Sequence, residues 1–236
     1  MSKDYFEFKQ FTIYHDRCAM KVGTDGVLLG AWSDVSENIR RILDIGTGSG
    51  LISIMLAQRC GANITGIDID EEAVAQAKEN GRRTPWAQHL HFETVDALSY
   101  IPRTKFDLIT CNPPFYTNSL PCSEQKRCLA RHTDTLPFDL LVQKVYGWLN
   151  DGGFFNVILP ASVTDYFVQE SWAAGLNLYK KCMVYSRSDI PAKRCLISLR
   201  KGCTNYPQID YLYILNEKGF YTEEYKKLTA SYYLNF

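Results

Sequence analysis

The chain has no hydrophobic run long enough to cross a membrane. None of its 236 residues belong to a stretch approaching about 18 apolar residues, the shortest length typical of a membrane helix. Its first ten residues, MSKDYFEFKQ, lack the apolar core of a signal peptide. These absences argue against membrane and secreted classes, and we expect a cytoplasmic protein.

The chain also lacks a regular cysteine pattern. Its eight cysteines form no CxxC motif, and several lie in apolar runs such as RCLISL. We interpret them as small core residues in a reducing compartment. His89 and His91 alternate along a predicted strand, and Cys122 and Cys128 lie in a polar loop. Neither pair has metal-ligand spacing, so we expect no metal site.

The chain has no net charge, because its 26 Lys and Arg residues balance its 26 Asp and Glu residues. This balance argues against a general binder of polyanions. The charge is nevertheless uneven, since residues 121–203 carry 11 basic and 7 acidic side chains. This local excess of four positive charges is compatible with a small footprint for phosphates.

No internal repeat, low-complexity stretch or linker divides the chain, and we predict one domain over residues 1–236. Short apolar segments alternate with amphipathic ones, which indicates an α/β fold with a mainly parallel sheet and helices on both faces. We predict strands at 40–46, 62–68, 89–96, 105–111, 154–160, 176–186 and 193–202. We predict helices at 51–60, 70–83, 137–149 and 161–175, with Asp70 as an N-cap and Pro137 in a first helical turn.

A glycine-rich turn, LDIGTGSG, follows the first predicted strand and opens a helix. Gly46, Gly48 and Gly50 allow a tight turn and a close approach of backbone to ligand. Their G-x-G-x-G spacing differs from the dinucleotide pattern G-x-G-x-x-G. Asp44 precedes them, and its charge would repel a pyrophosphate but attract the ammonium group of a bound amino acid. An NAD-dependent oxidoreductase is therefore disfavoured.

Two more acids end the next strands. Asp68 follows the second strand, where a carboxylate can accept hydrogen bonds from ribose hydroxyls, and Asp96 follows the third, where it can accept from an adenine amine. This order resembles the class I S-adenosylmethionine-dependent methyltransferases. The resemblance implies a Rossmann-like, mostly parallel seven-stranded sheet with an antiparallel C-terminal strand. It also implies that Asp44 and Gly46 face the methionine part of the cofactor.

The fourth strand ends in Asn112, Pro113, Pro114 and Phe115. The Asn112 side-chain oxygen and the Pro113 carbonyl can accept both N–H protons of a planar amine, which turns its lone pair towards a methyl donor. Phe115 can stack on the substrate ring. The tetrad resembles the signature of enzymes that methylate adenine N6, guanine N2 or glutamine amides, and we expect Asn112 to lie at the cofactor as well. The signature selects a planar amine and leaves its carrier open.

The segments GTDG, LDIGTGSG, NPPF, RHTD (131–134) and the tail GFYTEEYKKLTASYYL resemble one family over nearly the whole chain. That family is the bacterial tRNA1(Val) adenine-37 N6-methyltransferases. The resemblance implies monomethylation of adenine 37 in a valine tRNA, beside the anticodon. It suggests that Lys21, Thr24 and Asp25 help close the cofactor pocket. Residues 1–39 would then pack near the cofactor, and residues 204–236 form a C-terminal extension.

The RNA contacts are less defined. Arg131 and His132 either touch RNA or belong to a solvated loop, and Lys193 and Arg194 are further candidates. Scattered basic residues and aromatics are expected to hold the anticodon arm, the aromatics being residues such as Tyr5, Phe6, Phe8 and Tyr116. We expect a monomer. A release-factor glutamine methyltransferase and a guanine-N2 ribosomal RNA enzyme remain alternatives, whereas a non-catalytic RNA-binding module would have no reason to retain both the tetrad and the donor pocket. Only about 40 residues precede the first predicted strand, which is too few for the N-terminal helical domain usual in release-factor glutamine methyltransferases.

Overall fold

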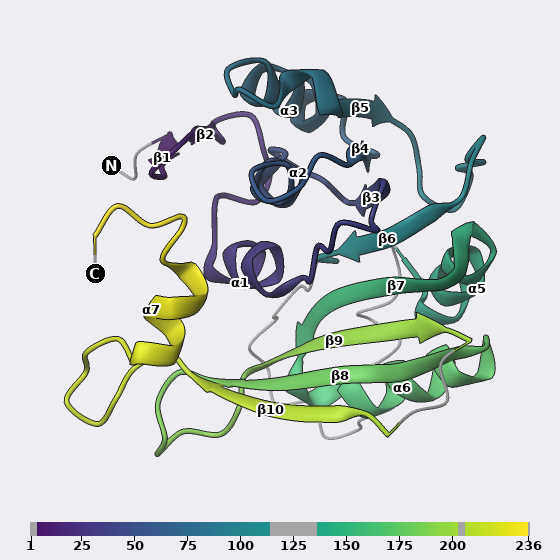
Figure 1. Ribbon diagram of the computed structural model, residues 1–236. Coiled ribbons are helices and arrows are strands. Elements are labelled where there is room, and N and C mark those ends of the chain that lie inside the picture. The colour runs from purple at the N-terminus through teal and green to yellow at the C-terminus, as the bar shows by residue number, and fades with distance from the viewer. Residues whose placement is uncertain (1–3, 114–135, 203–205, 236) are drawn as a thin grey trace.

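The computed structural model describes residues 4–113, 136–202 and 206–235, and these form an eight-stranded sheet with helices on both faces (Figure 1). The spatial strand order is β10-β8-β9-β7-β6-β3-β4-β5. Along the chain these strands are β3 (Arg41–Ile45), β4 (Asn63–Asp68), β5 (Leu90–Thr94), β6 (Phe106–Cys111), β7 (Leu149–Pro160), β8 (Leu176–Tyr185), β9 (Arg194–Lys201) and β10 (Gln208–Tyr213). Strands β1 (Tyr5–Glu7) and β2 (Thr12–Tyr14) form a separate hairpin.

The helices bury two hydrophobic cores, one on each face of the sheet. Helices α1, α2, α3 and α7 contribute to the first core, and α5 and α6 to the second. The helices are α1 (Thr24–Trp32), α2 (Leu51–Ala57), α3 (Glu71–Arg82), η1 (Ala87–His89), α5 (Phe138–Trp148), η2 (Ala161–Val163), α6 (Thr164–Ala173) and α7 (Glu223–Thr229). No helix within the described ranges is both long and apolar enough to cross a membrane.

The predicted fold class is confirmed, but the sheet has eight strands where we expected seven. The additional strand is β10, which pairs in parallel with β8 at the edge of the sheet. Strand β9 is antiparallel to both β7 and β8, as expected, yet it is not the last strand of the chain. The segment QIDYLY of β10 exposes most of its side chains, because only one neighbour and one face cover it. Its weak apolar pattern explains why it was missed.

Most element boundaries agree with the predictions to within a few residues. Asp70 is the N-cap of α3 as predicted, and its side chain accepts from the N–H groups of Glu72 and Ala73. Pro137 lies one residue before the first helical residue of α5, so its predicted place in the first turn was wrong. Strand β7 begins at Leu149 rather than 154, because Leu149 already pairs with Phe106 of β6. A register shift then separates this pair from the pair of Leu108 with Phe154, and Gly152 between them has a left-handed φ of +78°.

The sheet brings four carboxyl ends to one edge. Strands β5, β4, β3 and β6 are neighbours and all parallel. Each is followed by one of the predicted polar segments, so those segments must meet at that edge. The segment that follows β1 also lies beside the segment that follows α7 (Figure 1). The N–H of Lys9 donates to the carbonyl of Tyr232 at 2.8 Å, and Phe8 stacks on Tyr233.

Candidate active site

The glycine loop between β3 and α2 has the left-handed backbone that its sequence requires. The φ angles of Gly46, Gly48 and Gly50 are +68°, +53° and +82°, a region that residues with a Cβ rarely adopt. A Cβ at Gly46 or Gly48 would meet nothing within 4 Å, whereas one at Gly50 would lie 3.2 Å from the Cβ of Ala77. The first two glycines therefore border open space, and the third packs on α3.

Asp44 lies beneath this loop rather than on its open side. Its carboxylate has no exposed surface. One oxygen accepts from the hydroxyls of Thr47 and Ser53, both at 2.8 Å, and the other from the hydroxyl of Thr110 at 2.9 Å. Burial raises the pKa of Asp44, while the three hydroxyl donors oppose that shift. The expected direct contact with a ligand's ammonium is thus corrected, because the carboxylate is enclosed and organises the loop.

Asp68 and Asp96 remain partly accessible at the ends of their strands. The Asp68 carboxylate accepts from the N–H of Gly48 at 2.8 Å and from the N–H of Asp70 at 3.1 Å. One oxygen of Asp96 accepts from the N–H of Leu98 at 2.9 Å. The N–H of Val95, just before Asp96, donates to the carbonyl of Asp68 at 2.8 Å, so the two acids follow neighbouring strand ends.

Asn112 follows β6 directly beside the glycine loop. In the parallel pairing of β3 and β6, Ile45 is opposite Cys111, so Gly46 and Asn112 are the next residues on adjacent strands. Asn112 is half-buried and Pro113 is buried. The structure thus brings two of the four tetrad residues to the loop. The other predicted residues Pro114, Phe115, Tyr116, Arg131 and His132 lie outside the described residues.

The start of α1 carries a link that the sequence did not reveal. Lys21 and Thr24 are exposed next to it, in keeping with a surface that meets a ligand. Asp25 accepts a hydrogen bond from Nε of Arg194 at 2.7 Å, an ion pair between residues 169 positions apart. Lys193 is exposed, and its carbonyl accepts from Arg194 at 3.1 Å. Arg194 is therefore held by an intramolecular ion pair while its side chain stays 29% exposed, and its contact with RNA stays a prediction.

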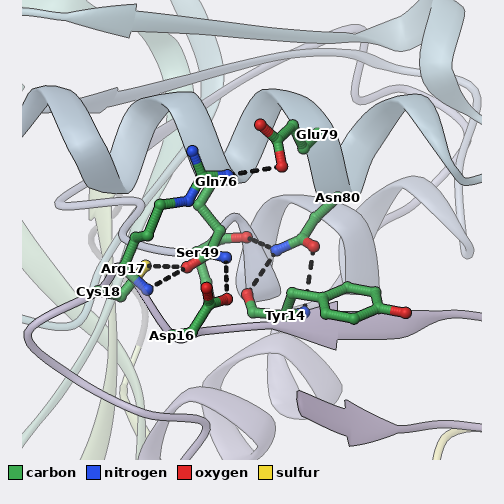
Figure 2. A network of polar contacts seen from close by, with 8 residues as sticks. All are labelled: Tyr14, Asp16, Arg17, Cys18, Ser49, Gln76, Glu79 and Asn80. Carbon is green, nitrogen blue, oxygen red and sulfur yellow. Dashed lines mark hydrogen bonds and ion pairs between the residues drawn. The ribbon is translucent and has the colours of Figure 1, made fainter. Parts of the chain in front are cut away.

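Sequence reasoning also missed two amide side chains of α3. Gln76 and Asn80 are buried and hold the segment after β2 (Figure 2). Their spacing of four residues, on the same helix face as the buried Ala73 and Ala77, was the available signal. Polar residues on an apolar helix face need hydrogen-bond partners, which here are backbone groups and the side chains of Asp16 and Cys18, all far away in the sequence.

These residues fit an adenosyl-type cofactor. Open space lies over Gly46 and Gly48, where a ligand can approach the backbone closely. Asp68 and Asp96 supply accessible carboxylates, which suit ribose hydroxyls and an exocyclic amine. Only glycine adopts the positive φ angles of this loop at little conformational cost. The loop therefore has a backbone that a ligand can approach closely.

Comparison with known proteins assigns the family. Residues 25–127 match the family model described as the methyltransferase small domain. A tRNA1(Val) (adenine(37)-N6)-methyltransferase of Phocaeicola vulgatus is 46% identical over 235 residues, covering 100% of both chains. The chain belongs to this family. The family member of Bacteroides fragilis strain YCH46 is 42% identical with 99% of each chain covered, and that of Proteus mirabilis is 38% identical with 99% and 95% covered.

Solved structures support the fold of this family member. A predicted O-methyltransferase of Agrobacterium tumefaciens has a TM-score of 0.65 at 17% identity, covering 88% of this chain and 96% of its own. The N-methyltransferase NodS of Bradyrhizobium japonicum, in complex with S-adenosyl-l-homocysteine, has a TM-score of 0.53 at 16% identity, covering 75% and 84%. At such identities the likeness shows the methyltransferase fold alone.

Proposed function

We propose that this protein is an S-adenosylmethionine-dependent methyltransferase that modifies the N6 amine of adenine 37 in valine tRNA. The observation that carries the proposal is the place of Asn112, which follows β6 beside the glycine loop of β3. Full-length similarity to tRNA1(Val) (adenine(37)-N6)-methyltransferases supports the choice of adenine and of tRNA.

The residues of the chain supply binding and orientation for the reaction. The cofactor, when bound, supplies a methyl group on a positively charged sulfur, so no further activation of the donor is needed. Gly46 and Gly48 let the backbone approach it, and Asp68 and Asp96 accept its ribose and adenine hydrogen bonds. The Asn112 side-chain oxygen and the Pro113 carbonyl accept the two N–H protons of the target amine. Transfer then depends on alignment more than on acid–base chemistry.

The substrate base has to leave its stack to reach Asn112. Enzymes that act on a single base hold it splayed out or flipped from the nucleic acid. We propose that Phe115 stacks on the adenine, and that Arg131, His132 and Lys193 contact the tRNA backbone. We further propose that the enzyme acts as a monomer and a single domain in the cytoplasm, where unmodified tRNA is available.

The decisive experiment is transfer of a labelled methyl group to unmodified tRNA, followed by nucleoside analysis. We expect the label in N6-methyladenosine of valine tRNA. Label in N2-methylguanosine of ribosomal RNA, or on a glutamine of a release factor added to the assay, would overturn the proposed substrate while keeping the planar-amine chemistry. Absence of label from every added substrate, with cofactor still bound, would overturn the catalytic proposal itself.

A further inference from the structure

The segment that joins β2 to α1 is bonded to α3, and we refer to residues 14–22 as the N-terminal strap. It begins at Tyr14, the last residue of β2, and ends just before Gly23, the N-cap of α1. No regular strand or helix holds the strap along residues 15–22. Its position therefore depends on specific contacts, most of which come from α3.

Asn80 ties the start of the strap to the glycine loop. The side chain has no exposed surface. Its amide nitrogen donates to the carbonyl of Tyr14 at 2.8 Å and to the carbonyl of Ser49 at 2.9 Å, and its oxygen accepts from the N–H of Tyr14 at 3.1 Å (Figure 2). Both amide hydrogens and the oxygen are thus used. One side chain fixes the residue before Gly50 and the strap at the same time.

Gln76, one helical turn earlier, holds the middle of the strap. It is buried, and its oxygen accepts from the N–H of Arg17 at 2.9 Å and from the thiol of Cys18 at 3.4 Å. Its nitrogen donates to the carboxylate of Asp16 at 2.6 Å. An ion pair between Arg17 and Glu79 adds a contact at the surface (Figure 2). Three successive strap residues are therefore bound to α3.

The glycine loop joins the strap to the carboxylate expected at the ribose. Asn80 donates to the carbonyl of Ser49 in the loop as well as to that of Tyr14 in the strap. The N–H of Gly48, the residue before Ser49, donates to the carboxylate of Asp68 at 2.8 Å. The raised pKa of the Cys18 thiol, about 11, agrees with this placement, since burial raises it first and the negative charges of Asp70 and Asp68 follow. Strap, carboxylate and glycine loop thus meet at one place.

We propose that Asn80 and Gln76 are positioning residues that hold the N-terminal strap as the ribose-side wall of the cofactor pocket. Asn80 couples this wall to the glycine loop, so disturbing either one weakens cofactor binding. A neutral amide suits position 80 because it both donates and accepts, whereas a charged side chain in the same buried place would face only backbone groups and no partner of opposite sign. The inference rests on the proposed function only in taking S-adenosylmethionine as the ligand.

The test uses the isosteric variant Asn80→Asp, which replaces the donating amide by an oxygen facing two carbonyls. We expect its dissociation constant for S-adenosylhomocysteine, measured by titration calorimetry, to rise tenfold or more. The KM for S-adenosylmethionine should rise alike, while kcat at saturating cofactor and the KM for tRNA stay within twofold. Asn63→Asp is the matched control, because Asn63 is exposed at the start of β4, and it should bind as the wild type does.

Hydrogen exchange of the wild-type protein, with and without ligand, gives a second readout. We expect S-adenosylhomocysteine to slow hydrogen exchange of the backbone amides of the strap. One of these is the N–H of Arg17, which donates a hydrogen bond to the side-chain oxygen of Gln76. Gln76→Ala should reduce that protection. Unchanged exchange on ligand binding, or an Asn80→Asp protein that melts earlier yet binds the cofactor normally, would overturn the inference. Methylation of a substrate other than tRNA would overturn the proposed function alone.

Discussion

The hydroxyl of Thr110 donates a hydrogen bond of 2.9 Å to the buried carboxylate of Asp44. The two residues are opposite each other on the parallel strands β6 and β3. Asp44 also holds the glycine loop through Thr47, and Thr110 lies two residues before Asn112. This contact therefore sets the position of the cofactor loop relative to the residue that we expect to hold the substrate amine.

Replacing Thr110 by valine should destabilise the protein. Thr110→Val keeps the shape but leaves one oxygen of the buried Asp44 without a donor, at a cost of about 1–3 kcal/mol. Urea unfolding measures the loss. The control is Thr65→Val on β4, whose hydroxyl makes no hydrogen bond to the part of the chain that the structure describes, and which should cost far less. Equal losses in both variants would contradict this role of Thr110.

The buried Asp44 should also give the protein a distinctive pH dependence. Because burial raises its pKa above the ordinary 3.8, the folded state keeps the Asp44 proton at pH values where the unfolded chain has lost it. This contribution to the free energy of unfolding is complete below 3.8 and is lost as pH rises through the folded pKa. Asp44→Asn lacks it. The difference in unfolding free energy between wild type and variant should thus fall as pH rises, and a constant difference would contradict the shift.

Close packing beneath the glycine loop predicts a cost for the smallest side chain at Gly66. An added Cβ would lie 2.6 Å from the Phe92 ring and 2.6 Å from the hydroxyl of Thr47. We expect Gly66→Ala to cost about 1–3 kcal/mol and to weaken cofactor binding by displacing Thr47. Gly61→Ala is the control, since a Cβ there meets nothing within 4 Å. Thermal melting of both variants measures the difference in stability. Similar melting temperatures would show that the glycine loop rearranges to accept the added Cβ without cost.

Local patterns of the sequence predicted the frame of the fold, and distant contacts explain what they missed. The strand that leads to Asp44 and the N-cap Asp70 depend on neighbours within a few residues, and both were predicted. The bond from Asn80 to Ser49 spans 31 residues and the pair of Asp25 with Arg194 spans 169. No periodicity encodes such distances. These two contacts can be recognised only once the strand order of the sheet has placed their elements side by side.

The ion pair between Asp25 and Arg194 separates the two basic residues that we had grouped as RNA contacts. Lys193 is exposed, and Lys193→Gln should lower the slope of log affinity for tRNA against log salt by about 1, as for one lost phosphate contact. Arg194→Gln should leave that slope unchanged but weaken cofactor binding, because it frees the start of α1. Filter binding at several salt concentrations measures the slope. A reduced slope for Arg194→Gln would instead assign Arg194 to the RNA.

Removal of the Asn112 side chain should separate chemistry from cofactor binding. Asn112→Ala deletes the acceptor for one N–H of the substrate amine, and loss of one preorganised polar group at a reacting centre typically costs about 100-fold to 1000-fold in rate. The dissociation constant for S-adenosylhomocysteine should stay within about twofold, because the glycine loop, Asp68 and Asp96 are untouched. Single-turnover methylation of tRNA measures the rate, and calorimetry the affinity. Asn112→Asp retains an acceptor oxygen and should keep more activity than Asn112→Ala. Equal rates for Asn112→Ala and the wild type would show that orientation of the amine does not depend on this side chain.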